Sequence, residues 1–214
     1  MLGIDFVICY IYSSYISYRL FGITLFPKVF FSSSLFRVVV TKSKNNTVIS
    51  NVEVPIIFES FVNGVDRTVF NIGSNSILEI NNRINIGNGC SISLAEKSKL
   101  TLCGELDGQV SGITSNTIII CKKKIHIGRG CIISWGCYIT DTSNHYINGY
   151  RHDESVFIGD KVWISEGCTV APGASIGDGS IVGAKSYVKG TFTPKTLIAG
   201  CPAKIKKWNI DWSR

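Results

Sequence analysis

The sequence of 214 residues predicts an all-β fold, a parallel β-helix in which the chain turns a corner every six residues. Every sixth residue from Ile158 to Val188 is aliphatic, a period that fits neither an α-helix nor a single strand. Four positions after each aliphatic residue, a second row holds small residues or valine, namely Val162, Cys168, Ala174, Ser180 and Ser186. Six units run without interruption, and stacked units of this kind bury a common core.

The same spacing occurs earlier in the chain, at Ile80, Ile86 and Ile92 and again at Ile127, Ile133 and Ile139. Ile139 and Ile158 are 19 residues apart, whereas an unbroken six-residue period requires a separation of 18. Residues 140–155 are therefore expected to leave the coil as a loop. We therefore predict an apolar N-terminal segment at 1–47, helix then strand, a β-helix at 48–193 and a basic C-terminal tail at 194–214.

The N-terminal segment is apolar, and Arg19 is its only charge between residues 6 and 26. It is long enough to span a bilayer, but its serines and tyrosines make it less apolar than a typical span, and it lacks the basic start of a secretory signal. Packing of this helix on the β-helix or on a neighbouring subunit is favoured, and contact with a membrane surface stays open. In the tail, two prolines and a lysine run predict a turn and then a short segment, of which a helix is one form.

The net charge of +7 comes from two basic stretches, 122–129 and 201–214. Without a nucleic-acid-binding motif, these favour a membrane surface or a phosphorylated small molecule as partner. Of eight cysteines, half fall in the small row, namely Cys90, Cys131, Cys137 and Cys168. Since no zinc spacing accompanies them, we expect buried free thiols and a cytoplasmic protein.

The loop at 140–155 holds the residues best suited to catalysis. Asp141 precedes His145 by four positions, and a histidine is well matched to general-base chemistry near neutral pH. A nearby carboxylate orients such a histidine. His152, in the same loop, is the rival base, whereas His126 lies between two isoleucines and is expected on the outer surface.

The run IGDKVWISEGCTVAPGASIGDGSIVGAKSYV, followed by IAGCPAKI, resembles the hexapeptide-repeat acyltransferases. The likeness is close over 118–208 and loose over 72–117, and the pattern around DTSNH and GCPAKIKKWNIDW resembles the subgroup encoded with surface-polysaccharide genes. It implies a left-handed β-helix, a homotrimer, and acetyl-CoA bound in the cleft between neighbouring prisms. The implied activity is acetyl-CoA-dependent O-acetylation of a sugar hydroxyl in a surface polysaccharide or its precursor. The apolar N-terminus is compatible with action on a lipid-linked saccharide at the cytoplasmic face of the membrane.

The resemblance also assigns roles to single residues. It makes His145 the general base and Asp141 the group that orients His145 or binds the acceptor. The cofactor-binding positions that it implies are Trp163, Ala184, Lys189, Lys204 and Lys207. Three positions depart from the family pattern, namely Ser165 after VWI, Cys201 in the turn before PAK, and Lys189-Gly190 where Thr-Lys is common.

Three other functions remain open on the sequence. An N-acetyltransferase acting on a nucleotide-linked amino sugar uses the same scaffold, and the length of the acyl donor is not fixed. A metal enzyme of the γ-type carbonic anhydrase kind needs three ligating histidines, and the spacings of 19 and 7 between the three histidines here do not resemble that site, so no metal is predicted. A non-catalytic β-helix, with Trp163 merely covering its edge, is the third.

Overall fold

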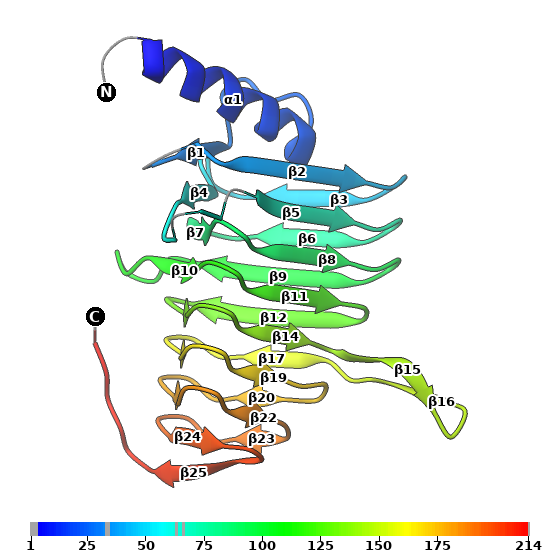
Figure 1. The fold of residues 1–214 in the computed structure, drawn as a ribbon, viewed down its shortest axis with the longest axis vertical. Helices are drawn as coiled ribbons and strands as arrows, with labels where there is room; N and C mark the ends of the chain where they lie inside the picture. The colour runs from blue at the N-terminus through cyan, green and yellow to red at the C-terminus, as the bar shows by residue number, and fades with distance from the viewer. Residues whose placement is uncertain (1–3, 33–34, 63, 66, 214) are drawn as a thin grey trace.

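The computed structural model describes residues 4–32, 35–62, 64–65 and 67–213, and these form a three-sided parallel β-helix with a helix, α1 (Ile4–Phe21), across its N-terminal end. Figure 1 shows the coils stacked in chain order from α1 to the C-terminal strands. The predicted fold class, a left-handed parallel β-helix with an apolar N-terminal helical segment and a short tail, is confirmed.

Each coil contributes one strand to each of three sheets, named A, B and C. Sheet A contains β1 (Val29–Phe31), β4 (Ile56–Glu59), β7 (Ile84–Gly87), β10 (Ser111–Ile113), β13 (Ile132–Ile133), β18 (Trp163–Ile164), β21 (Ile181–Val182), β24 (Leu197–Gly200) and β25 (Ala203–Lys207). Sheet B contains β2 (Arg37–Lys42), β5 (Arg67–Ile72), β8 (Ser91–Leu94), β11 (Ile118–Cys121), β14 (Tyr138–Thr140), β19 (Thr169–Val170) and β22 (Tyr187–Val188). Sheet C contains β3 (Thr47–Ser50), β6 (Ile77–Ile80), β9 (Lys99–Gly104), β12 (Lys124–Arg129), β17 (Val156–Ile158), β20 (Ser175–Ile176) and β23 (Thr191–Phe192).

The predicted aliphatic rows form the core. All six residues of the row from Ile158 to Val188 are fully buried, and they occupy sheets C, A and B in turn. Each stacks on its counterpart one coil away, as in the sheet B ladder of Ile92, Ile119, Ile139, Val170 and Val188. Burying one such side chain stabilises the fold by about 1.5–3 kcal/mol, so a ladder of this length accounts for much of the stability.

The narrow prism leaves little room at its corners. The predicted small slots hold Cys90, Cys131, Cys137 and Cys168, each at most 1% exposed and each a free thiol. Neighbouring coils also meet closely at Gly128, where an added Cβ would lie 2.4 Å from the backbone oxygen of Gly159. A larger side chain at such a position would push two coils apart.

Two predicted boundaries differ from the structure. Strands β1 and β2 already belong to the first coil, so the β-helix begins near Val29 and not at residue 48. The tail at 194–214 contains no helix in its described part: β24 continues sheet A in parallel, and β25 folds back on it antiparallel. The helix-then-strand order predicted for 1–47 matches α1, β1 and β2, although residues 1–3 and 33–34 lie outside the described residues.

Helix α1 packs against β1, β2 and β3 and closes the N-terminal end of the core. Ile16 and Leu20 are its buried contacts with the core cluster. Among the described residues, no helix combines the length and the apolarity needed to cross a bilayer.

Candidate active site

The loop predicted at 140–155 is a two-stranded hairpin of β15 (Thr142–Ile147) and β16 (Tyr150–Asp153) that projects from the coil. Its tip is Asn148-Gly149, both with positive φ angles of 52° and 78°, as a tight two-residue hairpin turn requires. At its base, the hydroxyl of Thr142 donates to Asp153 Oδ1 at 2.5 Å, and Arg151 Nε donates to Asp153 Oδ2 at 2.5 Å. The hairpin is therefore fixed at its base.

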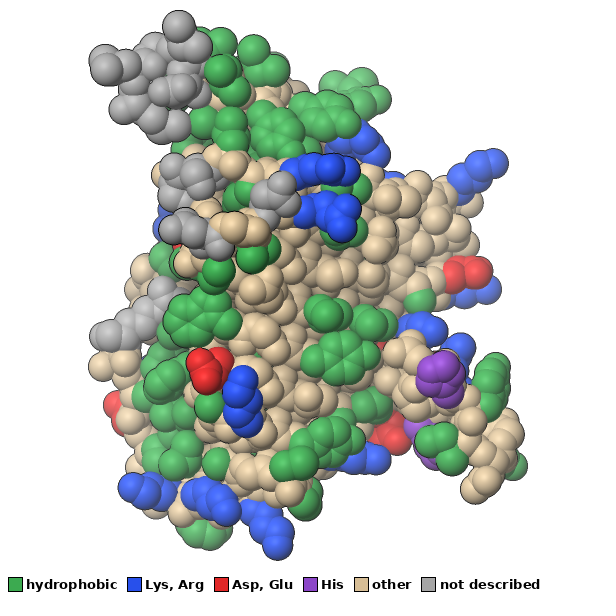
Figure 2. All heavy atoms as spheres, viewed as in Figure 1, with side chains coloured by type: hydrophobic (Ala, Val, Ile, Leu, Met, Phe, Trp, Pro, Cys, Tyr) green, Lys and Arg blue, Asp and Glu red, His purple; other side chains and the backbone are tan. Residues whose placement is uncertain are grey.

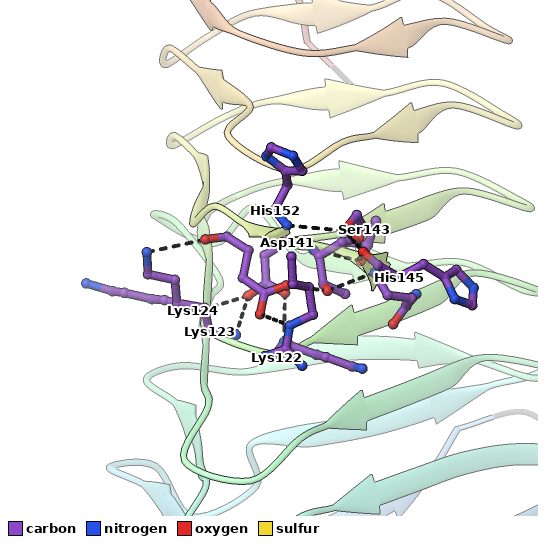
Figure 3. Close-up of polar contacts among 12 residues, drawn as sticks. Lys122, Lys123, Lys124, Asp141, Ser143, His145 and His152 are labelled. Atoms are coloured by element: carbon purple, nitrogen blue, oxygen red, sulfur yellow. Dashed lines mark hydrogen bonds and ion pairs between the residues drawn. The ribbon is translucent and has the colours of Figure 1, made fainter. Parts of the chain in front are cut away.

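Asp141 is fully buried directly before the hairpin, and its carboxylate binds backbone groups of the preceding turn. Oδ1 accepts the N–H of Lys122 at 2.7 Å, and Oδ2 accepts the N–H groups of Lys123 at 2.8 Å and Lys124 at 2.7 Å. The expected contact with His145 is absent from the structure, because these amides already occupy both oxygens. Figure 3 shows the three amide bonds converging on Asp141.

His145 lies on the exposed part of β15, and its imidazole points away from Asp141 (Figure 3). Within the described chain its ring makes no hydrogen bond, while the Ser143 hydroxyl donates to its backbone oxygen at 2.8 Å. An exposed imidazole without a partner is free to accept a proton from a molecule that binds beside the hairpin.

The rival base, His152, points toward the later coils and lines a pocket of about 420 Å³ between the hairpin and sheet B. Glu154 and Lys189 border the same pocket, and Tyr138 and Tyr187 form part of its wall. Aromatic walls with a few polar groups suit a sugar. Lys189, which the resemblance assigned to the cofactor, thus lies on the hairpin side of the molecule.

Trp163 lies on the outer side of sheet A and is 37% exposed. Its indole N–H donates to the hydroxyl of Ser134 at 3.3 Å, and its ring lies 6.0 Å from that of Trp212. Trp212 reaches this face because the tail runs back along the prism, where its own indole N–H donates to the backbone oxygen of Lys161 at 3.0 Å. Sheet A therefore carries a paired aromatic surface.

Three of the other four predicted cofactor residues lie on or next to sheet A. Ala184 is exposed in the turn that follows β21 of sheet A, and Lys204 and Lys207 are exposed on β25 of the same sheet. The hairpin, by contrast, leaves the prism between β14 of sheet B and β17 of sheet C. In a three-sided prism that corner is opposite sheet A, so one chain cannot bring His145 and Trp163 together.

His126, expected on the surface, is on the outer side of sheet C, where it stacks on Phe157 at 4.9 Å between ring centres. Partial burial lowers the pKa of His126 below its usual value.

Burial also raises the pKa of the Cys90, Cys131 and Cys137 thiols to about 12, which makes them poor nucleophiles and poor metal ligands. Across the described ranges, no three His, Cys, Asp or Glu side chains lie together as metal ligands would.

Comparison with known proteins agrees with this fold. The model of the bacterial transferase hexapeptide (six repeats) matches residues 155–190, the stretch that forms β17 to β22. The polysialic acid O-acetyltransferase OatWY superposes with a TM-score of 0.61 at 25% identity, covering 86% of this chain and 91% of the other. The chain is therefore similar to the bacterial hexapeptide-repeat transferases over residues 155–190, and it shares the fold of OatWY over most of its length.

Two further similarities accompany these matches. WbbJ of Escherichia coli (strain K12), named as a lipopolysaccharide biosynthesis O-acetyl transferase, is 43% identical to this chain over 58 residues. That match spans 27% of the chain and 30% of the length of WbbJ. The acetyltransferase NeuO, specific for polysialic acid, shares the fold with a TM-score of 0.54 at 19% identity, covering 87% and 89% of the two chains.

Sequence reasoning missed two features of this site. The Asn148-Gly149 pair is a short-range hairpin signal that could have indicated the turn, although Asn88-Gly89 has the same composition and forms no hairpin. The pairing of Trp163 with Trp212 depends on the path of the tail, for which the sequence contains no periodic signal.

Proposed function

We propose that this protein is an acetyl-CoA-dependent O-acetyltransferase acting on a sugar hydroxyl of a surface polysaccharide or its precursor, with His145 as general base. The observation that carries the proposal is the exposed, unpartnered imidazole of His145 on a hairpin whose base is fixed by Asp153. The length over which OatWY resembles this chain supports the same reaction class.

The placement of the site residues favours a site shared by two chains in a homotrimer. The hairpin lies at the corner opposite sheet A, so the Trp163 surface that accompanies His145 is supplied by a neighbouring chain. Closed rings are built by head-to-tail contacts of this kind, in which two different surfaces of one chain meet. Acetyl-CoA then lies along sheet A, with its phosphates near Lys204 and Lys207 and its pantetheine amides near the backbone of Ala184.

The chemistry assigned to His145 is the uptake of one proton and its later return. Its imidazole takes the proton of the sugar hydroxyl while that oxygen forms a bond to the thioester carbonyl carbon. The carbon–sulfur bond then breaks, and the coenzyme A thiolate that leaves takes the proton back. Such a base contributes about 10²- to 10⁴-fold, and holding both substrates beside the hairpin supplies much of the remaining acceleration.

We assign the pocket of His152 to the acceptor, because Tyr138 and Tyr187 offer aromatic faces next to the hairpin. Lys189, at the border of this pocket, is then placed to contact the acceptor or the donor phosphates. Asp141 has no place in this chemistry, since its oxygens bind backbone amides. The free cysteines fit a protein that works in the reducing cytoplasm, where acetyl-CoA is made.

The experiment that tests the proposal is a mass-spectrometric screen of acetyl-CoA against saccharides with hydroxyl and amine acceptors. We expect a gain of one acetyl group on a hydroxyl, lost in His145→Ala and kept at a reduced level in His152→Ala. His152→Ala is the matched control because it removes an exposed imidazole from the same hairpin. Acetylation of an amine would replace the O-transfer assignment, and full turnover by His145→Ala would remove His145 from the mechanism.

A further inference from the structure

Helix α1 turns its larger apolar side chains outward. The face that packs on the β-helix consists mostly of small residues, and its buried positions are Cys9, Ser13, Ile16, Ser17 and Leu20. The opposite face is about half exposed and almost entirely apolar or aromatic, with Phe6, Val7, Ile8, Tyr10, Ile11, Tyr15 and Tyr18. A helix on the surface of a water-soluble domain shows the reverse pattern.

The segment after α1 extends this apolar surface. Ile23 is 95% exposed, Leu25 90% and Phe26 70%, so these three side chains contact almost nothing in the chain. They line one hollow together with Tyr10 and Tyr18 of the exposed helix face, which makes the surface continuous. Contiguous apolar surfaces of this kind mark contact sites for a protein or a membrane.

Basic side chains border this apolar surface of α1 and the segment that follows it. Residues 6–62 contain five Lys and Arg residues against two Glu residues. Arg19 binds the backbone oxygen of Val40, Lys28 lies over the Phe21 ring, and the Lys42 ammonium donates to the backbone oxygen of Leu20 at 2.9 Å. Figure 2 shows hydrophobic side chains gathered at the N-terminal end with Lys and Arg side chains beside them. Tyrosines within an apolar face bordered by cations are typical of helices that lie in a membrane interface.

The position of this apolar surface favours a membrane over a second copy of the chain as its partner. Helix α1 lies across the end of the prism and not on one of its three sides (Figure 1). Chains that pack side by side through sheet A and the hairpin all present this end in one direction, so the patches of an oligomer face one plane. We propose that this end docks on an anionic bilayer surface, with the exposed face of α1 and residues 22–27 embedded in the interface.

This docking also sets the height of the candidate active site, a consequence that rests on the proposed function. Between β2, next to α1, and β14, where the hairpin begins, sheet B advances by four strand spacings, β2-β5-β8-β11-β14. At about 4.8 Å a spacing, the hairpin lies roughly 20 Å beyond the first coil. The acceptor that fits is a lipid-anchored saccharide whose modified sugar is several units from the bilayer, and not the sugar attached to the lipid.

The test is sedimentation of the full chain with vesicles of phosphatidylethanolamine and phosphatidylglycerol, without acetyl-CoA or acceptor. Because no turnover is measured, failure of the transferase assignment would leave this result unaffected. We expect binding that weakens with salt and with replacement of phosphatidylglycerol by phosphatidylcholine. Combining Ile23→Ser, Leu25→Ser and Phe26→Ser should lower the partition coefficient by about a hundredfold or more.

Ile118→Ser is the matched control, because it removes an exposed aliphatic side chain from the middle of sheet B, and it should bind vesicles like the wild type. Leu25→Ser alone, with far-UV circular dichroism of each variant, separates loss of binding from loss of fold. Absence of wild-type binding would overturn the proposal. A triple variant that keeps vesicle binding would also overturn it. Loss of oligomeric mass by the triple variant in analytical ultracentrifugation would overturn it too, because the apolar surface would then be a subunit contact.

Discussion

Replacing Asp141 tests whether this residue holds the fold or takes part in catalysis. In Asp141→Asn the amide oxygen replaces one carboxylate oxygen, and the –NH₂ group replaces the other. If the amide oxygen faces Lys123 and Lys124, the –NH₂ group faces the N–H of Lys122, which leaves a buried donor unpaired. An unpaired buried donor costs about 1–3 kcal/mol, and the two remaining bonds lose the roughly twofold advantage of a charged acceptor.

The expected loss is therefore about 3 kcal/mol in the free energy of unfolding, or roughly 6–12 °C in melting temperature for a chain of this size. Urea unfolding followed by circular dichroism measures the first quantity, and calorimetry measures the second. Asp211→Asn is the control, because Asp211 is an exposed partner of Lys161, and its replacement should leave the free energy of unfolding almost unchanged. If Asp141→Asn unfolds like the wild type but loses turnover, the structural role assigned to Asp141 is wrong.

Two further predictions concern the coil. Gly128→Ala places a Cβ against the backbone of Gly159 and should cost about 1–3 kcal/mol in the free energy of unfolding, measured with urea. Gly112→Ala is the control and should be tolerated, because its Cβ would be 3.7 Å from its nearest neighbour. Equal effects of the two substitutions would contradict the close approach of the coils. Burial lowers the pKa of His126 in the folded protein, so the unfolded chain binds the proton first and stability falls as pH drops below the usual histidine pKa of about 6.5. His126→Phe should reduce this fall in the urea midpoint between pH 7.5 and 5, and an unchanged fall would exclude His126 as its source.

The later coils were predictable from sequence because they are short and regular. Ile164 and Val182 pair across one coil at a separation of 18 residues, so the six-residue period is visible. In the first coils, Phe58 pairs with Ile86 at a separation of 28 residues, because longer strands and turns are inserted. That irregularity hides the period between Val38 and Phe70, which is why the predicted start at residue 48 came too late.

The candidate site was predicted as a set of residues and not as an arrangement. The sequence identifies His145 as a loop histidine, but the partners of Asp141 are amides some 17–19 positions earlier, which only the folded chain brings close. The separation of His145 from Trp163 follows from the order of the sheets along the chain, because the loop leaves after a strand of sheet B and Trp163 lies on a strand of sheet A. The sequence can assign residues to these sheets only once the three-sided coil is known.

Mixed oligomers test the central proposal, a site built from the hairpin of one chain and sheet A of the next. His145→Ala chains and Trp163→Ala chains are purified separately, shown to be inactive, and then refolded together in equal amounts. In a closed ring, about a quarter of the sites combine an intact His145 with an intact Trp163 from the neighbouring chain, so acetyl transfer should return to about a quarter of the wild-type rate. Mixtures as inactive as either variant alone would contradict a site shared between chains.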